Sequence, residues 1–255
     1  GGNWLDSTNT IIVNPINVNA LASGTYNYTY EVTNSCGDDE QLVQLEILPT
    51  PEVLTSNVTI APICIGNNAT IQFSGMQDGN YTINYSVLGV NNITTQSETI
   101  TITGGLGSFN IPSTSLSNIG TSTITFENIA NTVTNCTATL VNVTSIIEVK
   151  PLLDILPNVI TVANVCLGTD VTVVFTNATN FPDGTYQFNY TIPTGNPTTG
   201  NSGDVLITAG NGQFTIPAAL FTTAGNHSVT ITGIFATNEC SNPNESIILN
   251  FVIET

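Results

Sequence analysis

Positive charge is almost absent from this sequence. Its 255 residues include one Lys, no Arg and one His, against 18 acidic residues, so the formal net charge is −17. Proteins bind nucleic acids and anionic lipid surfaces by neutralising phosphates with Lys and Arg, so both classes of partner are excluded. Because general acid–base chemistry near neutral pH relies mostly on His and Lys, we also expect no enzyme activity.

Long apolar runs are missing as well. No stretch approaches the roughly 18 apolar residues of a membrane-spanning helix, so direct membrane insertion is not expected. The chain opens with Gly1-Gly2-Asn3-Trp4 and has no basic leader, which we interpret as a start inside a longer precursor. Only 7% of the residues are charged, so the surface must consist of Thr, Asn, Ser and Gly, which favour strands and turns over exposed helices.

An internal repeat organises the chain. Cys64-Ile65-Gly66 recurs as Cys166-Leu167-Gly168, at an offset of 102 residues. The same order is kept by three further pairs of motifs: Asp78-Gly79-Asn80-Tyr81 with Asp183-Gly184-Thr185-Tyr186, Phe109-Asn110-Ile111-Pro112 with Phe214-Thr215-Ile216-Pro217, and Thr134-Asn135-Cys136 with Thr237-Asn238-Glu239-Cys240. Repetition at a fixed period is the signature of an array of similar structural units.

The repeat predicts three segments. Residues 1–50 are expected to be the C-terminal half of a repeat, residues 51–150 a complete repeat, and residues 151–255 a second complete one. The boundaries fall at Pro49-Thr50-Pro51 and Lys150-Pro151. Because Pro fixes φ and removes a donor, both junctions should be short and stiff.

Hydrophobic alternation predicts strands throughout. Tyr81, Ile83, Tyr85 and Val87 alternate with polar residues, and Tyr186, Phe188, Tyr190 and Ile192 do the same. A period of two with one polar face is typical of antiparallel strands that bury one face. Turn signals such as Asp78-Gly79 and Gly104-Gly105 separate the runs. About seven short strands in about 100 residues indicate an all-β, antiparallel Greek-key sandwich.

The five cysteines suggest disulfides. Each complete repeat holds two, so we expect the intradomain pairs Cys64–Cys136 and Cys166–Cys240, formed in an oxidising compartment. Zinc is the alternative, but neither CxxC nor Cys-His spacing is present. Cys36 is left over: either its partner lies upstream, or it is a free thiol that links chains.

Acidic turns offer candidate calcium ligands. Asp38, Asp39 and Glu40 form the densest cluster, and Asp78 and Asp183 occupy equivalent turns. Calcium prefers six to eight oxygen ligands, and no EF-hand pattern is present. Asp-Gly is also a good turn dipeptide, so both interpretations stay open. We expect no other metal or cofactor.

His227 is the one histidine. It follows Gly225-Asn226 at the expected start of a strand. A catalytic triad with a Ser and an Asp has no supporting motif, so we expect a surface histidine.

The repeat resembles a known family. Its Cys-x-Gly opening, its Gly24-Thr25-Tyr26-Asn27-Tyr28-Thr29-Tyr30 strand and its Thr-Asn-x-Cys turn look like the immunoglobulin-like repeats of very large Bacteroidota surface proteins, flavobacterial gliding-motility adhesins among them. The resemblance implies tandem immunoglobulin-like sandwiches in an elongated array. It also implies type IX secretion and an extracellular, cell-surface location. Asp6-Ser7-Thr8 resembles the O-glycosylation triplet of that phylum, which makes Ser7 a glycosylation candidate.

Three functions follow as hypotheses. The first is a structural filament (shaft) segment of a repetitive adhesin, supporting surface attachment or gliding motility. Its partners would be neighbouring repeats, surface polysaccharide, or outer-membrane motility and secretion components. The second is a carbohydrate-binding module with Trp4, Tyr26, Tyr81 or Tyr186 as sugar platforms, although alternation places most of these rings in a core. The third is an accessory domain of a secreted polysaccharide-active enzyme.

Overall fold

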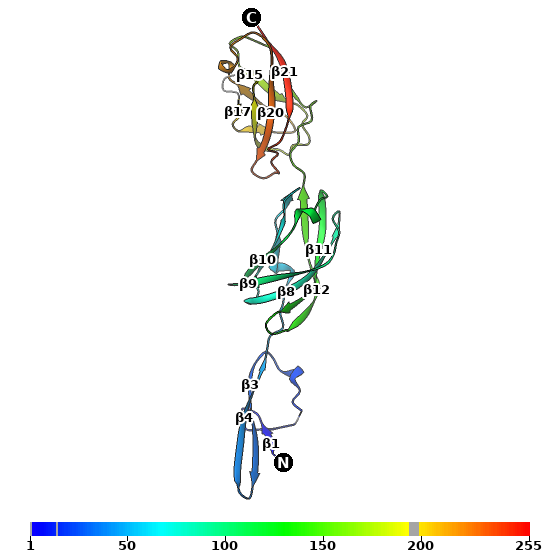
Figure 1. The fold of residues 1–255 in the computed structure, drawn as a ribbon, viewed down its shortest axis with the longest axis vertical. Helices are drawn as coiled ribbons and strands as arrows, with labels where there is room; N and C mark the ends of the chain where they lie inside the picture. The colour runs from blue at the N-terminus through cyan, green and yellow to red at the C-terminus, as the bar shows by residue number, and fades with distance from the viewer. Residues whose placement is uncertain (1, 14, 194–198) are drawn as a thin grey trace. The chain divides into compact units, whose positions relative to one another are not determined.

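The computed structural model describes residues 2–13, 15–193 and 199–255 (Figure 1). Gly1, the first residue of the expected 1–50 segment, lies outside them. Within this part of the chain the regular structure is β-strand, apart from four single-turn 3-10 helices at Val18–Ala20, Thr55–Asn57, Ser113–Ser115 and Ala218–Leu220. The all-β prediction is therefore confirmed. No helix among these residues is long and apolar enough to cross a membrane.

The first sheet has the order β2-β1-β3-β4, with the bounds Ile11–Ile12, Asn3–Leu5, Gly24–Asn34 and Gly37–Ile47. β3 and β4 form a long antiparallel hairpin, closed by a two-residue turn between Asn34 and Gly37. β1 pairs with β3 through Trp4 and Tyr30, whose ring centroids lie 5.1 Å apart. By sequence, Gly1-Gly2-Asn3-Trp4 corresponds instead to Gly104-Gly105 and Gly210-Asn211-Gly212, which lead into strands of the opposite sheet in the later repeats. An unpaired strand edge is a template for any nearby segment, which explains this placement.

The second group of strands forms two sheets, β10-β7-β5 and β6-β12-β11-β8-β9. In chain order the strands are β5 (Val58–Ile60), β6 (Ile63–Cys64), β7 (Ala69–Ser74), β8 (Gly79–Gly89), β9 (Ile93–Ile102), β10 (Leu106–Ile111), β11 (Gly120–Asn131) and β12 (Thr137–Lys150). Phe73 of the first sheet contacts Phe126 of the second at 5.6 Å between ring centroids, and Tyr81, Ile83, Tyr85 and Val87 of β8 are all buried. Two sheets thus enclose one core, as alternation predicted.

The third group repeats this arrangement. Its sheets are β13-β15-β19 and β14-β21-β20-β16-β17, with β18 also paired to β16. The strands are β13 (Ile160–Val162), β14 (Val165–Cys166), β15 (Val171–Phe175), β16 (Gly184–Thr191), β17 (Thr199–Asn201), β18 (Val205–Ile207), β19 (Gly212–Ile216), β20 (Gly225–Ala236) and β21 (Ile247–Glu254). A single core unites both sheets, with Phe175, Phe188 and Phe214 stacked inside it. The chain is therefore built from repeated immunoglobulin-like sandwiches.

The opening strand of each complete sandwich is divided between the two sheets. Its first part, β5 or β13, pairs antiparallel with β7 or β15. Its second part, β6 or β14, pairs parallel with the last strand, β12 or β21. Among the strand pairs of the described residues, these two are the parallel ones, and each contains a cysteine.

By its contacts the chain divides into two compact units. The first comprises residues 1–60, 70–111 and 122–146, and the second comprises residues 61–69, 112–121 and 147–255. The boundaries after residues 50 and 150 rest on the sequence repeat and stay predictions. Cys64 and Cys240 both belong to the second unit.

Candidate functional site

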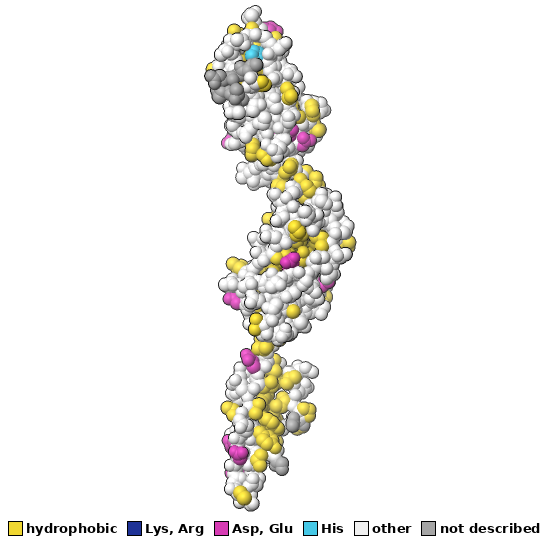
Figure 2. All heavy atoms as spheres, in the orientation of Figure 1, with side chains coloured by type: hydrophobic (Ala, Val, Ile, Leu, Met, Phe, Trp, Pro, Cys, Tyr) yellow, Lys and Arg dark blue, Asp and Glu magenta, His cyan; other side chains and the backbone are white. Residues whose placement is uncertain are grey.

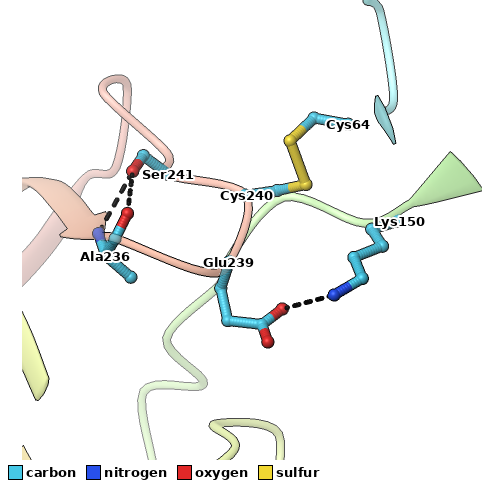
Figure 3. The surroundings of a disulfide bond; sticks show 6 residues. All are labelled: Cys64, Lys150, Ala236, Glu239, Cys240 and Ser241. Atoms are coloured by element: carbon cyan, nitrogen blue, oxygen red, sulfur yellow. Dashed lines mark hydrogen bonds and ion pairs between the residues drawn. A yellow bond between two sulfur atoms is a disulfide. The ribbon is translucent and has the colours of Figure 1, made fainter. Parts of the chain in front are cut away.

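The second unit contains a disulfide between Cys64 and Cys240, whose Cα atoms lie 5.4 Å apart (Figure 3). The predicted pairs Cys64–Cys136 and Cys166–Cys240 are therefore wrong. The bond joins residues 176 positions apart in the sequence, one in the segment predicted as 51–150 and one in the segment predicted as 151–255. The disulfide is consistent with an extracellular location, since such bonds persist in oxidising compartments.

Strand geometry explains why the intradomain pairs do not form. Cys64 lies beside Lys150, the last residue of β12, whereas Cys136 directly precedes its first residue. β12 has 14 residues, which extend about 45 Å at about 3.3 Å per residue. A disulfide requires Cα atoms within about 7 Å. Cys166 lies in the same way beside Glu254, the last residue of β21, and Cys240 precedes that strand.

Backbone hydrogen bonds hold both cysteines in place. The N–H of Ile65 donates to the Lys150 carbonyl at 2.9 Å, which fixes the end of β6 against β12. The N–H of Leu153 donates to the Cys240 carbonyl at 2.8 Å. Cys240 is only 3% exposed. The three residues after β12 thus bring the chain directly past the Cys240 loop.

An ion pair lies beside the disulfide. Lys150 Nζ is 3.5 Å from a carboxylate oxygen of Glu239, and Figure 3 shows this pair next to the sulfur bridge. Both side chains are about 30% exposed. Ion pairs of this exposure contribute less than about 1 kcal/mol. The disulfide, not the ion pair, is therefore the strong connection here.

Three cysteines within the described residues form no disulfide. Cys36 is exposed in the turn of the β3–β4 hairpin, and its N–H donates to Asn34 Oδ1 at 2.8 Å. Cys166 is exposed at the end of β14, and Cys136 is partly exposed before β12.

The acidic residues proposed for calcium do not converge. Asp38, Asp39 and Glu40 lie in succession on β4, so their side chains alternate between the two faces of the sheet. The described residues contain no group of three or more His, Cys, Asp or Glu side chains placed to hold a metal ion. The calcium hypothesis stays a prediction.

Asp78 and Asp183 have a turn-capping geometry instead. Asp78 Oδ1 accepts a hydrogen bond from the Gly105 N–H at 2.8 Å, and Asp183 Oδ1 accepts one from the Ala209 N–H at 2.7 Å. Hydrogen bonds from the N–H groups of Gly105 and Gly104 hold the pKa of Asp78 below its ordinary value. The repeated Asp-Gly motif thus clamps the turn that the repeated glycines form.

Two of the four candidate sugar platforms are core residues. Tyr81 and Tyr186 are each 2% exposed, and their hydroxyls donate to the carbonyls of Gln77 and Pro182. Burial and the nearby acidic charges raise the pKa of Tyr186. Rings enclosed in this way cannot stack on a sugar.

Trp4 and Tyr26 are half-buried on the first sheet. Tyr26 lines an open cavity of about 680 Å³, together with Ile12, Val13 and Leu21. Figure 2 shows hydrophobic side chains gathered over this part of the chain. The two complete sandwiches cover the corresponding face with a second sheet, so the exposed apolar surface has the character of an uncovered core face.

His227 is not the surface residue that the sequence predicts. It is 7% exposed, within β20. Its Nε2 lies 2.8 Å from the Thr223 carbonyl oxygen, and its ring packs against Phe221 and Phe251, with centroids 5.5 and 6.1 Å away. The sequence signal was present: position 227 lies two residues before Val229, so period-two alternation places it on the buried face.

Ser7 is exposed in the turn after β1. The Asp6 carboxylate accepts hydrogen bonds from the Thr8 hydroxyl at 2.7 Å and from the N–H groups of Thr8 and Thr10. The hydrogen bond from the Thr8 hydroxyl has the largest effect on the pKa of Asp6, and together with the two backbone hydrogen bonds it lowers that pKa. The turn leaves the Ser7 hydroxyl accessible, and its modification stays a prediction.

No protein-family model matches the chain, and no curated protein sequence matches it. Among solved structures, it is similar to the FN1–FN3 domains of chicken CNTN1, with 12% identity and a TM-score of 0.46 over 91% of this chain and 76% of that one. It is also similar to the I67–I69 I-band fragment of titin, with 13% identity and a TM-score of 0.41 over 100% and 88% of the two chains. Sidekick-1 immunoglobulin domains 1–5 match with 12% identity and a TM-score of 0.37 over 98% and 52%. The fold is therefore assigned from the strand order and core of the chain itself.

Proposed function

We propose that this chain is a non-catalytic structural segment of a repetitive cell-surface adhesin, a shaft that supports surface attachment or gliding motility. The observation that supports it best is the Cys64–Cys240 disulfide, which joins one predicted repeat to the next. In a tandem array, stability comes from each unit and from the contacts between neighbours. A covalent bond between neighbours makes the junction as durable as the units themselves.

The surface chemistry supports the same function. The net charge of −17 comes with one Lys and no Arg, so copies of the chain repel one another and stay dispersed. The disulfide supports export from the cytoplasm. Surface polysaccharide and outer-membrane motility or secretion components are the partners implied by the motif resemblance, and type IX secretion is the implied route.

Mechanical extension tests the structural role. While the disulfide is intact, the chain between its two cysteines cannot be stretched. These 176 positions correspond to roughly 600 Å of extended chain at about 3.5 Å per residue. We expect a chain pulled by its two ends to extend by this much less under oxidising conditions than under reduction. The C64S/C240S double variant should reach full extension without reductant, and C136S should behave as wild type.

The adhesin role needs a separate test on cells. An antibody raised against this chain should label intact cells of the organism that produces it, without permeabilisation. Deleting the gene should reduce attachment to a surface. Labelling that requires permeabilisation, or attachment unchanged by the deletion, would reject the adhesin function and leave the mechanical result untouched.

Calcium binding and glycosylation of Ser7 are each tested by one measurement. Since the Asp78 and Asp183 carboxylates already accept backbone hydrogen bonds in their turns, we expect EDTA to leave the melting temperature unchanged. A lower midpoint in EDTA that is restored by added Ca²⁺ would identify a calcium site.

Mass spectrometry of the chain from its natural source should find an O-linked glycan on Ser7, and an unmodified Ser7 would remove that part of the proposal.

A further inference from the structure

We infer that Cys166 and Cys136 are half-sites of the same inter-repeat disulfide that Cys64 and Cys240 form. Cys166 takes the second cysteine of a repeat copy that follows it, and Cys136 takes the first cysteine of a copy that precedes it. "First cysteine" denotes Cys64 or Cys166, and "second cysteine" denotes Cys136 or Cys240. The inference goes beyond the proposed function, because it assigns partners to thiols whether or not the chain acts in adhesion.

Cys166 has the backbone setting of Cys64. Each ends a two-residue strand that pairs parallel with the last residues of its sandwich, Cys64 with Lys150 and Cys166 with Glu254. The next residue donates its N–H to that same partner, Ile65 to Lys150 at 2.9 Å and Leu167 to Glu254 at 2.8 Å.

The match continues into the following turn. A glycine with φ near 90° comes next in both, Gly66 and Gly168. The carbonyls of Cys64 and Cys166 accept from Asn67 and Thr169, at 3.0 and 3.1 Å. The backbone therefore presents the Cys166 thiol as it presents the bonded Cys64.

Cys136 has the chain position of Cys240. Both follow a Thr-Asn pair in the loop between the last two long strands, β11–β12 for Cys136 and β20–β21 for Cys240. Cys136 is partly exposed, whereas Cys240 is buried next to its partner. The difference in exposure is what an occupied and an unoccupied half-site should show.

The two cysteines of one repeat cannot bond to each other, because the length of the last strand separates them. The first cysteine lies at the C-terminal end of the last strand and the second cysteine precedes its N-terminal end, as the 14-residue β12 shows. Only the chain that leaves the last strand brings a new second cysteine to that end, as Leu153 does by bonding the Cys240 carbonyl. The partner of a first cysteine must therefore belong to the next copy of the repeat.

The oxidation is an ordinary thiol–disulfide exchange. The two thiols lose two protons and two electrons and form one S–S bond. The oxidant is the disulfide of a thiol–disulfide oxidoreductase outside the cytoplasm, which is reduced to a dithiol. Oxidised glutathione replaces it in vitro and leaves as two molecules of reduced glutathione.

An extended chain tests the Cys166 half-site. The full chain is followed directly by a second copy of residues 151–255 and is refolded with oxidised glutathione. The added copy carries Leu167→Val and Asn238→Ser, at exposed positions beside its cysteines, so that its peptides differ in mass from those of the original copy. Free thiols are then alkylated in acid, and the product is digested with pepsin, since the single Lys precludes trypsin mapping. Mass spectrometry without reduction should find Cys166 bonded to the Cys240 of the added copy, with the original Cys64–Cys240 bond as the internal control for folding.

Matched variants separate the outcomes. C166S in the extended chain should leave the Cys240 of the added copy alkylated and the original bond intact. With the original bond present, an alkylated Cys166 would overturn the inference, and so would a bond between the two cysteines of the added copy. A second chain has an extra copy of residues 51–150 inserted before Pro51, marked by Ile65→Val and Val133→Ala so that its peptides differ in mass from the original ones. The original Cys136 should bond to the Cys64 of the marked copy, and an alkylated Cys136 there would overturn the other half.

Discussion

Asp78 shows how one side chain fixes a local structure at the residue scale. Gly104 and Gly105 both adopt positive φ, a conformation open to glycine without steric cost. The Asp78 carboxylate then accepts the Gly105 N–H. Asp183 does the same in the next repeat with Ala209, so the Asp-Gly motif marks a clamped turn in both repeats.

The lowered pKa of Asp78 predicts a pH dependence. Because the folded-state pKa lies below the ordinary value of 3.8, the stabilisation is fully present above about pH 4 and is lost as pH falls through the folded value. We expect the melting temperature of wild type to exceed that of Asp78→Asn at about pH 6, and the difference to shrink at about pH 2.5. Asp38→Asn, which removes an exposed carboxylate from β4, is the charge-matched control, and a pH-independent difference for Asp78→Asn would contradict the assignment.

His227 gives a second prediction at the same scale. His227→Ala should lower the free energy of unfolding by about 2 kcal/mol or more, because it leaves a cavity beside the Phe221 and Phe251 rings. His227→Phe keeps a ring but leaves the Thr223 carbonyl without this hydrogen bond, at a cost of about 1–3 kcal/mol. Urea unfolding measures both. The exposed neighbour Asn226→Ala should be neutral, and a neutral His227→Ala would show that the ring does not contribute to the core.

At the scale of elements, the short parallel strands β6 and β14 determine which cysteines can form a disulfide. β6 and β14 have two residues each, too few for a hydrophobic pattern to reveal. They nevertheless hold the first cysteine of each repeat against the end of the last strand.

A proline substitution tests whether the pairing of β6 with β12 positions Cys64 for its disulfide. Ile65→Pro removes the N–H that donates to Lys150, so we expect β6 to detach and a smaller fraction of Cys64–Cys240 bond to form during oxidative refolding. Leu167→Pro makes the same change at β14 and should leave that fraction unaltered. Equal yields from the two variants, measured by thiol alkylation, would show that β6 does not position Cys64.

The disulfide has its largest effect on the whole molecule. In the chain-entropy model, closing a loop across 176 positions stabilises the folded state by at most roughly 5 kcal/mol. We expect Cys240→Ala to lower the denaturant midpoint of the second unit, with a loss of about 2–5 kcal/mol. Cys136→Ala, which breaks no bond, should change the midpoint little. A Cys240→Ala variant as stable as wild type would show that the connection does not stabilise this unit.

Local pattern by itself determined the fold class of this protein. Alternation along β8 and β16 placed Tyr81 and Tyr186 in the core, because a strand turns successive side chains to opposite faces. The repeated motifs showed which positions are equivalent in the two complete repeats. The absence of Arg, with a single Lys, predicts that nucleic acid is not a partner.

Only the tertiary structure decided which cysteines meet. The sequence showed that Cys64 is equivalent to Cys166, and Cys136 to Cys240, and shared membership of a repeat favoured the wrong pairs. Pairing depends on which end of the last strand each cysteine reaches, and that distance is set by sheet register. The bond between Cys64 and Cys240 follows from β6 lying parallel to the end of β12 and from Leu153 leading the chain past the Cys240 loop.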